Sequence, residues 1–223
     1  MMMRIGLFGG TFNPIHMGHI QVALKVNKTF SLDKILFIPS ALPPHKELGD
    51  VVDVKDRLEM IHRALIPYPG FEISDVELKR PGPSYTIDTV RHFKRIMDEG
   101  TTLYLLLGLD AFLEIDTWKS YSHLFLMTPF IVIMRTCDKQ NDAGYGWKIL
   151  EEFLKSRVSG GYKYSELRSC FSHEKKQPIF LFNVTPIDIS STNIRQRIKK
   201  GKSIERMVPD VVENFIKNKG LYL

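Results

Sequence analysis

Two histidines, His16 and His19, end the segment Gly9–His19, which reads GGTFNPIHMGH. The apolar run Arg4–Phe8 comes directly before it, so we expect a buried strand that ends in a glycine turn and opens a helix. Backbone N–H groups at a helix start have no partner within the helix and carry the positive end of its dipole. Glycines let this backbone approach an anion, and two imidazoles three residues apart can donate to one phosphate chain. The pattern indicates a site for nucleotide phosphates.

Two other interpretations of the histidine pair stay open at this point. The histidines could form an ordinary pair on a surface helix. They could also bind a metal ion, but this spacing lacks a third and a fourth ligand nearby.

A second element of the same kind comes late in the chain. Ser190, Ser191 and Thr192 precede a helix whose first turn presents Arg195. Hydroxyls at a helix start can cap the helix or bind an anion, and a guanidinium offers a planar fork to two phosphate oxygens. By itself the segment fits plain capping equally well.

The chain alternates strand-like apolar runs with amphipathic stretches, which indicates an α/β fold with a mostly parallel, doubly wound sheet covered on both faces. The expected strands are Arg4–Phe8, Ile35–Ile38, Glu72–Leu78, Leu103–Leu107, Phe130–Met134 and Ile179–Val184. The expected helices are His19–Lys28, Val54–Ala64, Tyr85–Asp98 and Ala111–Trp118, followed after the sheet by Asn193–Lys200 and Pro209–Asn218. Ligands of such sheets bind at the carboxyl ends of the strands, where Gly9, Ser40, Gly108 and Arg135 fall.

The 223 residues suit a single domain, 1–223, with an insertion at about 137–178. Glycines divide this insertion into a Trp147–Arg157 helix and a polar loop, and we expect it not to carry the chemistry. The net charge of +6 favours anionic partners, but its scatter along the chain fits nucleotides as well as nucleic acid.

No apolar stretch is long enough for a membrane span, and the first residues show no signal-peptide pattern. Cys137 and Cys170 share no metal or redox spacing. We therefore expect a cytoplasmic protein with reduced thiols and no membrane partner.

The segment GGTFNPIHMGH resembles the HxGH signature of the nucleotidyltransferase superfamily. It most resembles the form of this signature found in nicotinate mononucleotide adenylyltransferases. Four further patches and the late ISSTNIR segment fit the same family, and the resemblance covers nearly the whole chain except 137–178. The patches are Pro39–Lys46 (PSALPPHK), Ser84–Thr89 (SYTIDT), Gly108–Asp110 (GLD) and Thr117–Lys119 (TWK).

The resemblance implies transfer of AMP from ATP to nicotinate mononucleotide, in NAD biosynthesis, with Mg²⁺ carried by ATP and no metal site on the protein itself. The implied catalytic residues are His16, His19 and Arg195. The implied ATP contacts are Gly9, Gly10, Thr11, Phe12, His16, His19, Gly108, Asp110, Ser190, Ser191, Thr192 and Arg195. The implied acceptor contacts are Ser40, His45, Lys46, Tyr85, Thr86, Trp118 and Arg135. A homo-oligomer is possible, and no nucleic-acid partner is expected.

Two residues depart from the family pattern: Asn13 stands where Asp is usual, and Leu109 where a smaller or more polar residue is usual. Asn keeps the turn-forming side chain but loses the charge, so we expect changed local electrostatics with activity retained. The alternatives are transfer to nicotinamide mononucleotide or phosphopantetheine, cytidylyl transfer, a non-catalytic nucleotide sensor, and an RNA-binding relative of the class I synthetases. The last would need a separate anticodon domain, for which the chain is too short.

Overall fold

Apolar runs of five or six residues form the central strands of this protein, because strands buried on both faces need side chains that avoid water on both sides. The computed structural model describes residues 3–41, 51–135, 145–185 and 188–223. The chain divides into two compact units, Met1–Phe8 with Tyr85–Pro186 and Gly9–Ser84 with Ile187–Leu223. Strand β1 (Arg4–Gly10) passes from the first unit into the second.

The first unit is built on parallel strands. β1 pairs with β4 (Thr102–Gly108), β4 with β5 (Phe130–Arg135), and β5 with β8 (Ile179–Val184), all in parallel. β7 (Cys170–Ser172) continues from β8 as an antiparallel neighbour, and β6 (Lys163–Ser165) pairs antiparallel with β7. The side chains of Phe112, Phe125 and Phe130 pack edge-on or tilted against one another in its core, with ring centroids 4.8–6.0 Å apart.

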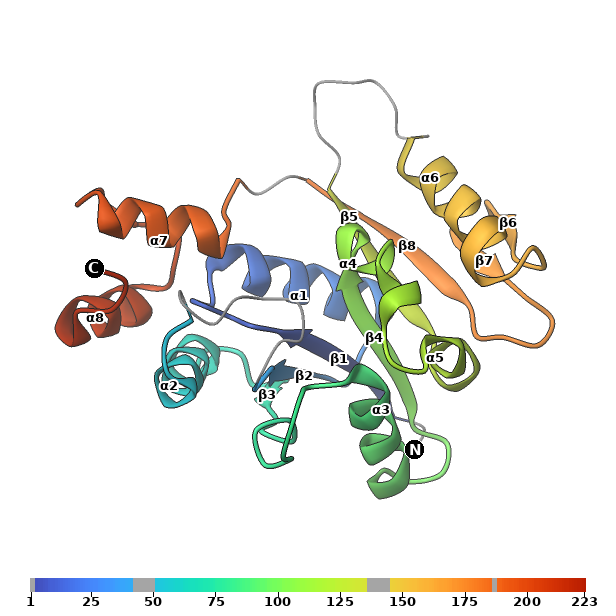
Figure 1. Cartoon of the computed structure of the whole chain (residues 1–223), viewed down its shortest axis with the longest axis horizontal. Helices are drawn as coiled ribbons and strands as arrows, with labels where there is room; N and C mark the ends of the chain where they lie inside the picture. Colours follow the sequence, from blue (N-terminus) through green and yellow to red (C-terminus); the bar gives the residue numbers. More distant parts are fainter. Residues whose placement is uncertain (1–2, 42–50, 136–144, 186–187) are drawn as a thin grey trace. The chain divides into compact units, whose positions relative to one another are not determined.

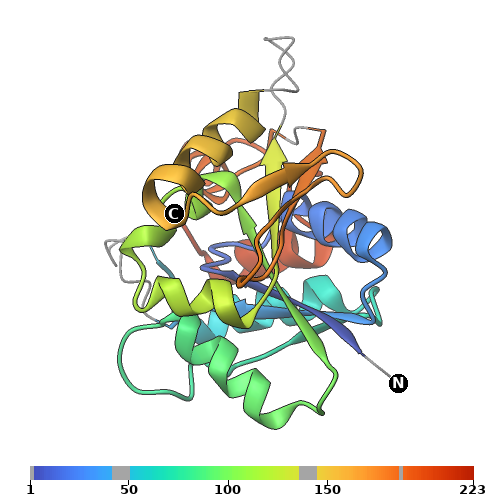
Figure 2. The same cartoon turned by 90° about the vertical axis from the view of Figure 1, so that its right-hand side faces the viewer.

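The helices of the first unit lie between and after these strands. They are α3 (Thr86–Ile96), α4 (Leu109–Phe112), the 3-10 turn η2 (Ile115–Thr117), α5 (Tyr121–Met127), α6 (Tyr145–Phe153) and the π-helical turn η3 (Leu154–Val158). α6 lies beside β6 and β7 in both views (Figures 1 and 2), where the ring of Trp147 stacks on that of Tyr164.

The second unit contains α1 (Met17–Phe30), β2 (Lys34–Pro39), α2 (Val54–Leu65), β3 (Phe71–Ile73), α7 (Ser191–Lys199) and α8 (Asp210–Lys219). β2 and β3 pair in parallel. α2 packs against α8, as Figure 1 shows, although about 150 residues separate them in the sequence. The start of the chain and its end therefore build this unit together.

The expected α/β class of Rossmann-like, doubly wound type with C-terminal helices is confirmed, and the described strands number eight. The described residues include no helix that is both long and apolar enough to cross a membrane. The assignment of 137–178 as an insertion in a single domain stays a prediction.

Two expected elements were wrong in extent. The strand Glu72–Leu78 stops at Ile73, because Ser74 Oγ accepts from the Val76 N–H and the carbonyl of Asp75 accepts from Leu78, which turns the backbone. The expected helix Ala111–Trp118 is two short turns, α4 and η2. Thr117 Oγ1 donates to the carbonyl of Glu114, and such local bonds compete with a continuous helix.

The segment 158–178, expected as a polar loop, contains β6 and β7, and the helix expected at Trp147–Arg157 is α6 followed by η3. Helix α5 was not expected at all. Strands of three residues are too short to show an alternating pattern, which is why the sequence does not reveal them.

Candidate active site

Gly9 and Gly10 are the last two residues of β1, so the strand runs two residues beyond its expected end at Phe8, and the turn follows at Thr11–Pro14. The segment Gly9–Pro14 is called the glycine turn below. Phe12 adopts a left-handed conformation (φ 48°), and its buried ring contacts the rings of Phe37 and His19. A Cβ on Gly10 would lie 3.1 Å from the Phe12 ring, so a side chain there would displace a packed aromatic. A Cβ on Gly9 would meet nothing within 4 Å. Gly10 is therefore required by the fold, whereas the space beside Gly9 is open to a ligand.

His16 and His19 stand against each other at the start of α1. Their rings are stacked, with centroids 3.7 Å apart and planes 25° apart. His16 is the N-cap residue and is 3% exposed, so it precedes the first turn of the helix on which the sequence placed both histidines. A Cβ on Gly18 would lie 2.9 Å from Nδ1 of His16, so only glycine leaves room for this ring.

The backbone of His16 determines the protonation pattern of His19. The N–H of His16 donates to Nδ1 of His19 at 3.3 Å. Because Nδ1 accepts this hydrogen bond, the proton of the neutral imidazole is on Nε2, which makes Nε2 a donor. The His19 side chain can therefore donate to an anion without first becoming charged.

The late serine-rich segment lies against the glycine turn. Ser191 Oγ donates to the carbonyl of Pro14 at 2.9 Å, and Nη1 of Arg195 donates to the carbonyl of Asn13 at 2.9 Å. The two phosphate-directed motifs, about 180 residues apart in sequence, are thus brought together within the second unit.

The remaining hydroxyls of that segment differ in their surroundings. Ser190 Oγ accepts from the N–H of Asn193 at 3.1 Å, so the capping interpretation holds for this residue. Thr192 is exposed in the first turn of α7.

Asn13, the departure from the family pattern, is 3% exposed and has a structural role. Its Oδ1 accepts from the hydroxyl of Tyr222 at 2.9 Å and from the N–H of Val52 at 3.3 Å. Burial raises the pKa of the Tyr222 hydroxyl well above its usual range, which keeps the hydroxyl protonated as a donor. An acceptor oxygen is what these contacts need, and the amide supplies one.

Ser40, expected near the acceptor, lies directly after β2 and is tied to the glycine turn by its backbone. Its N–H donates to the carbonyl of Gly10 at 2.9 Å. Nη1 of Arg57 donates to the carbonyls of both Ser40 and Thr11, at 2.9 and 2.8 Å. His45 and Lys46, on the same predicted loop, lie outside the described residues.

Sequence reasoning missed Arg57 and Tyr222. Arg57 is buried on the same face of α2 as Met60, Ile61 and Ala64, at the i, i+3, i+4, i+7 spacing of a core stripe. A charged residue within such a stripe is the signal that could have found it. Nothing in the sequence near Tyr222 points to Asn13.

In the first unit, the two patches predicted for the acceptor are joined by Lys119. Tyr85 is the N-cap residue of α3 and Thr86 its first residue, while Trp118 ends η2 and is half-buried. Nζ of Lys119 lies 4.5 Å from the centroid of the Tyr85 ring and 3.0 Å from a carboxylate oxygen of Asp88. Nothing in the sequence alone assigns a role to Lys119.

The other predicted residues of the first unit lie at strand ends. Gly108 ends β4 and is exposed, and a Cβ there would meet nothing within 4 Å. Asp110 is exposed in the first turn of α4, and Arg135 is the last residue of β5. Gly108 and Arg135 therefore have the strand-end placement that the sequence predicts, and Asp110 follows β4 in the next helix.

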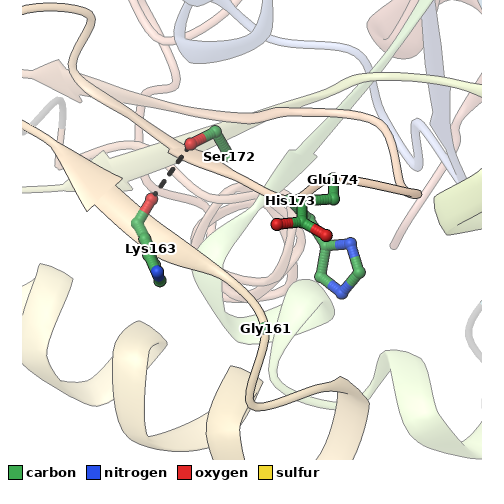
Figure 3. A pocket seen from close by; sticks show the side chains of 5 residues that line it. All are labelled: Gly161, Lys163, Ser172, His173 and Glu174. Atoms are coloured by element: carbon green, nitrogen blue, oxygen red, sulfur yellow. Dashed lines mark hydrogen bonds between the residues drawn. The ribbon is translucent and has the colours of Figure 1, made fainter.

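A cavity of about 460 Å³ in the first unit holds none of the predicted residues (Figure 3). It is lined by Gly161, Lys163, Ser172, His173 and Glu174. Nδ1 of His173 accepts from the Lys175 N–H, so its Nε2 carries the proton and faces the Ser159 hydroxyl at 3.0 Å as a donor. This histidine is thus not arranged to act as a base on the serine.

Comparisons with known proteins agree on one family. The model of the cytidylyltransferase-like family matches residues 7–197. A relative from Desulfatibacillum aliphaticivorans, named "Probable nicotinate-nucleotide adenylyltransferase", is 41% identical over 99% of this chain and 100% of its own length. A relative of the same name from Thermoanaerobacter sp. (strain X514) is 40% identical over 99% of this chain and 94% of its own.

The solved structures that resemble this chain support the fold. The nicotinic acid mononucleotide adenylyltransferase of Plasmodium falciparum, complexed with NaAD, superposes with a TM-score of 0.72 at 21% identity, over 99% of this chain and 97% of that one. A structure from Vibrio parahaemolyticus, described as that of a "Putative Nicotinate-nucleotide Adenylyltransferase", gives a TM-score of 0.61 at 17% identity, over 99% and 96% of the two chains.

Proposed function

Because the chain belongs to the nicotinate-nucleotide adenylyltransferases of the cytidylyltransferase-like family, we propose that it transfers AMP from ATP to nicotinate mononucleotide. The products are nicotinate adenine dinucleotide and pyrophosphate, in NAD biosynthesis. The observation that carries the proposal is the joining of the two phosphate-directed motifs by Ser191 and Arg195. A nucleotide sensor would not need this constellation together with acceptor patches, and the family is one of enzymes.

The reaction requires no covalent enzyme intermediate. An oxygen of the acceptor's phosphate attacks the α-phosphorus of ATP, a new P–O bond forms, and the bond from the α-phosphorus to the bridging oxygen breaks. The electron pair of that bond leaves with pyrophosphate. The acceptor phosphate is already ionised at neutral pH, so catalysis consists of positioning and of stabilising the charge on the leaving group.

We assign the phosphates of ATP to residues of the second unit. The open backbone at Gly9–Thr11 and the Nε2–H of His19, beside His16, would bind the α- and β-phosphates. Arg195 would bind the β- and γ-phosphates together with the Ser190–Thr192 segment. A guanidinium has five N–H donors, so its bond to Asn13 leaves it able to bind phosphate oxygens as well.

Residues of the first unit would select the two nucleosides. Gly108 and Asp110 would contact the adenosine. Trp118 would stack on the pyridine ring, and the N-terminal turn of α3 at Tyr85 and Thr86 would donate to the nicotinate carboxylate. Arg135 and Ser40, with His45 and Lys46, complete the proposed acceptor contacts.

Mg²⁺ is proposed to arrive with ATP and to neutralise charge on its phosphates. The described residues contain no group of three His, Cys, Asp or Glu side chains that could hold a metal ion. Phosphate oxygens and water would be its main ligands in this proposal, which suits a cation that loses its hydration reluctantly. A cytoplasmic location, a possible homo-oligomer and the lack of a nucleic-acid partner are parts of the same proposal.

The fate of a label at the α-phosphorus of ATP tests the proposal. With nicotinate mononucleotide and Mg²⁺, we expect the label in the dinucleotide and none in pyrophosphate. Label retained in ATP or released as free AMP would contradict adenylyl transfer.

A further inference from the structure

Arg57 is a buried cation that the mechanism above does not use. It is 1% exposed, and it lies on the core-facing side of α2 with Met60 and Ile61. Burying a charged group carries a large desolvation penalty, and an apolar residue of similar volume would pack as well or better. Packing alone therefore does not explain a guanidinium at this position.

One nitrogen of Arg57 bonds two segments that are assigned to different substrates. Nη1 donates to the carbonyl of Thr11 at 2.8 Å and to the carbonyl of Ser40 at 2.9 Å. Thr11 belongs to the turn proposed to bind ATP, and Ser40 begins the loop proposed to bind the acceptor. Nε of Arg57 has no hydrogen-bond partner among the described residues, so the two carbonyls are the directed contacts of this side chain.

These bonds fix the orientation of two peptide groups. The carbonyl of Thr11 shares its peptide plane with the N–H of Phe12, and that of Ser40 shares its plane with the N–H of Ala41. A cation on the carbonyl oxygen polarises the peptide and strengthens its N–H as a donor. The N–H of Ala41 already donates to Ser84 Oγ at 2.9 Å, so the strand end is held from both sides.

The charges around Arg57 leave it a cation. Burial lowers the pKa of its guanidinium, while Tyr222 and Asp53 oppose that change. A guanidinium stays protonated in proteins, so the positive charge persists beneath the phosphate-binding turn.

We propose that Arg57 is a positioning residue that couples the ATP-binding turn to the acceptor-binding loop through the carbonyls of Thr11 and Ser40. The inference rests on the proposed function, because the two segments are assigned to their substrates there. Arg57 itself touches neither substrate. Its loss should loosen both segments at once.

The test is Arg57→Met, which keeps most of the bulk of the side chain, ends two bonds short of Nη1 and removes both hydrogen bonds. Arg63→Met is the matched control, because Arg63 is on the same helix but is only half-buried and pairs with Glu59 and the ring of Phe215 instead of Thr11 and Ser40. Thermal unfolding and initial rates with each substrate varied are measured for both variants. We expect Arg57→Met to raise the KM for ATP and the KM for nicotinate mononucleotide, each on the order of tenfold, and Arg63→Met to change neither.

A lower melting temperature with both KM values unchanged would mean that Arg57 acts only on stability, and would overturn the proposal. A rise in one KM alone would overturn the coupling. Arg57→Lys separates charge from geometry, because its ammonium keeps the charge but ends one bond short of Nη1. We expect both KM values to rise in this variant also. Normal values would overturn the role proposed for the two hydrogen bonds, and failure of both variants to fold would overturn the proposal by assigning Arg57 to stability.

Failure of the proposed function is distinguishable from failure of this inference. If the wild type does not turn over nicotinate mononucleotide, the function is wrong, but calorimetric titration with Mg·ATP still compares wild type with Arg57→Met. Weaker ATP binding in the variant would support the Thr11 contact, and equal binding would overturn it.

Discussion

A hydrogen bond from the backbone N–H of His16 makes Nε2 of His19 a hydrogen-bond donor. The N–H of His16 occupies Nδ1 of His19 and leaves the proton on Nε2, while the ring of His16 is stacked against it. A neutral side chain that is already held in the donating tautomer does not need to reorganise when charge builds up on the leaving pyrophosphate.

Replacing His19 by Ala should keep the fold and lower kcat by about 10²–10³, the usual loss for one donor to developing charge. His16→Ala should act similarly, because it removes the ring that packs against His19. Steady-state kinetics with circular dichroism check this, with His123→Ala, an exposed histidine of α5, as the control. Normal turnover in folded His19→Ala would reject the catalytic role.

Trp118 is the residue proposed to select the acceptor. If its half-buried ring stacks on the pyridine, Trp118→Ala should weaken acceptor binding by about 1–3 kcal/mol, the range for base–aromatic stacking, and leave ATP binding unchanged. Titration with each substrate measures both. Trp147, whose ring stacks on Tyr164, is the control for losing an indole elsewhere. An unchanged acceptor KM in Trp118→Ala would mean that Trp118 has only a packing role.

The glycines of β1 and α1, on either side of the turn that joins the two elements, have different roles. Gly18 leaves room for the His16 ring, because a Cβ there would lie 2.9 Å from Nδ1, whereas a Cβ on Gly9 would meet nothing within 4 Å. Packing within the protein therefore requires glycine at position 18, whereas at position 9 only a bound ligand would require it.

Two alanine substitutions separate these duties. Gly18→Ala should lower kcat, because the added methyl displaces His16 from its partner ring. Gly9→Ala should leave the melting temperature unchanged and raise the KM for ATP, because the methyl occupies space proposed for a phosphate. Melting curves and ATP kinetics of both variants check this, and a Gly9→Ala enzyme with wild-type KM would remove Gly9 from the ATP contacts.

Elements with a strong local pattern could be predicted from the sequence, and those set by tertiary contacts could not. The apolar runs of β4 and β5 lie where the sequence places them, and β1 extends through Gly9 and Gly10 before the predicted turn. β7 is three residues long and is held by pairing with β8, so its existence depends on a distant neighbour rather than on its own pattern. The break between α4 and η2 likewise depends on a side-chain bond of Thr117.

At the scale of the whole molecule, residues from the two ends of the chain meet in the second unit. Tyr222 donates to Asn13, and Arg195 donates to the same residue's carbonyl. The motifs were recognisable in the sequence, because their chemistry is local. The buried partners Arg57 and Tyr222 were not, because their roles depend on contacts with residues far away in the sequence.

Two buried tyrosines, Tyr162 and Tyr222, should make the free energy of unfolding depend on pH in the alkaline range. Burial raises the hydroxyl pKa of Tyr222 and of Tyr162 above the unfolded value of 10.0. The contribution of these two hydroxyls to the free energy of unfolding is fully present below pH 10. It is lost as pH rises towards the folded pKa, because the hydroxyls of the unfolded chain release their protons first. The free energy of unfolding should fall by about 1.4 kcal/mol per pH unit for each group.

Tyr222→Phe should therefore make the decline above pH 10 shallower, whatever its effect at neutral pH. Urea unfolding at pH 8, 10 and 11 measures the slope for both proteins. Equal slopes would mean that Tyr222 titrates alike in the folded and unfolded chains.

The acceptor preference of the wild type tests directly whether nicotinate mononucleotide is the substrate. Initial rates of pyrophosphate release are measured with Mg·ATP and, in turn, nicotinate mononucleotide, nicotinamide mononucleotide and phosphopantetheine. We predict the highest kcat/KM for nicotinate mononucleotide, because an amide brings donors to a site built from donors and leaves them unpaired. Equal kcat/KM for the two pyridine mononucleotides, or a preference for phosphopantetheine, would contradict the assignment of this chain to nicotinate mononucleotide.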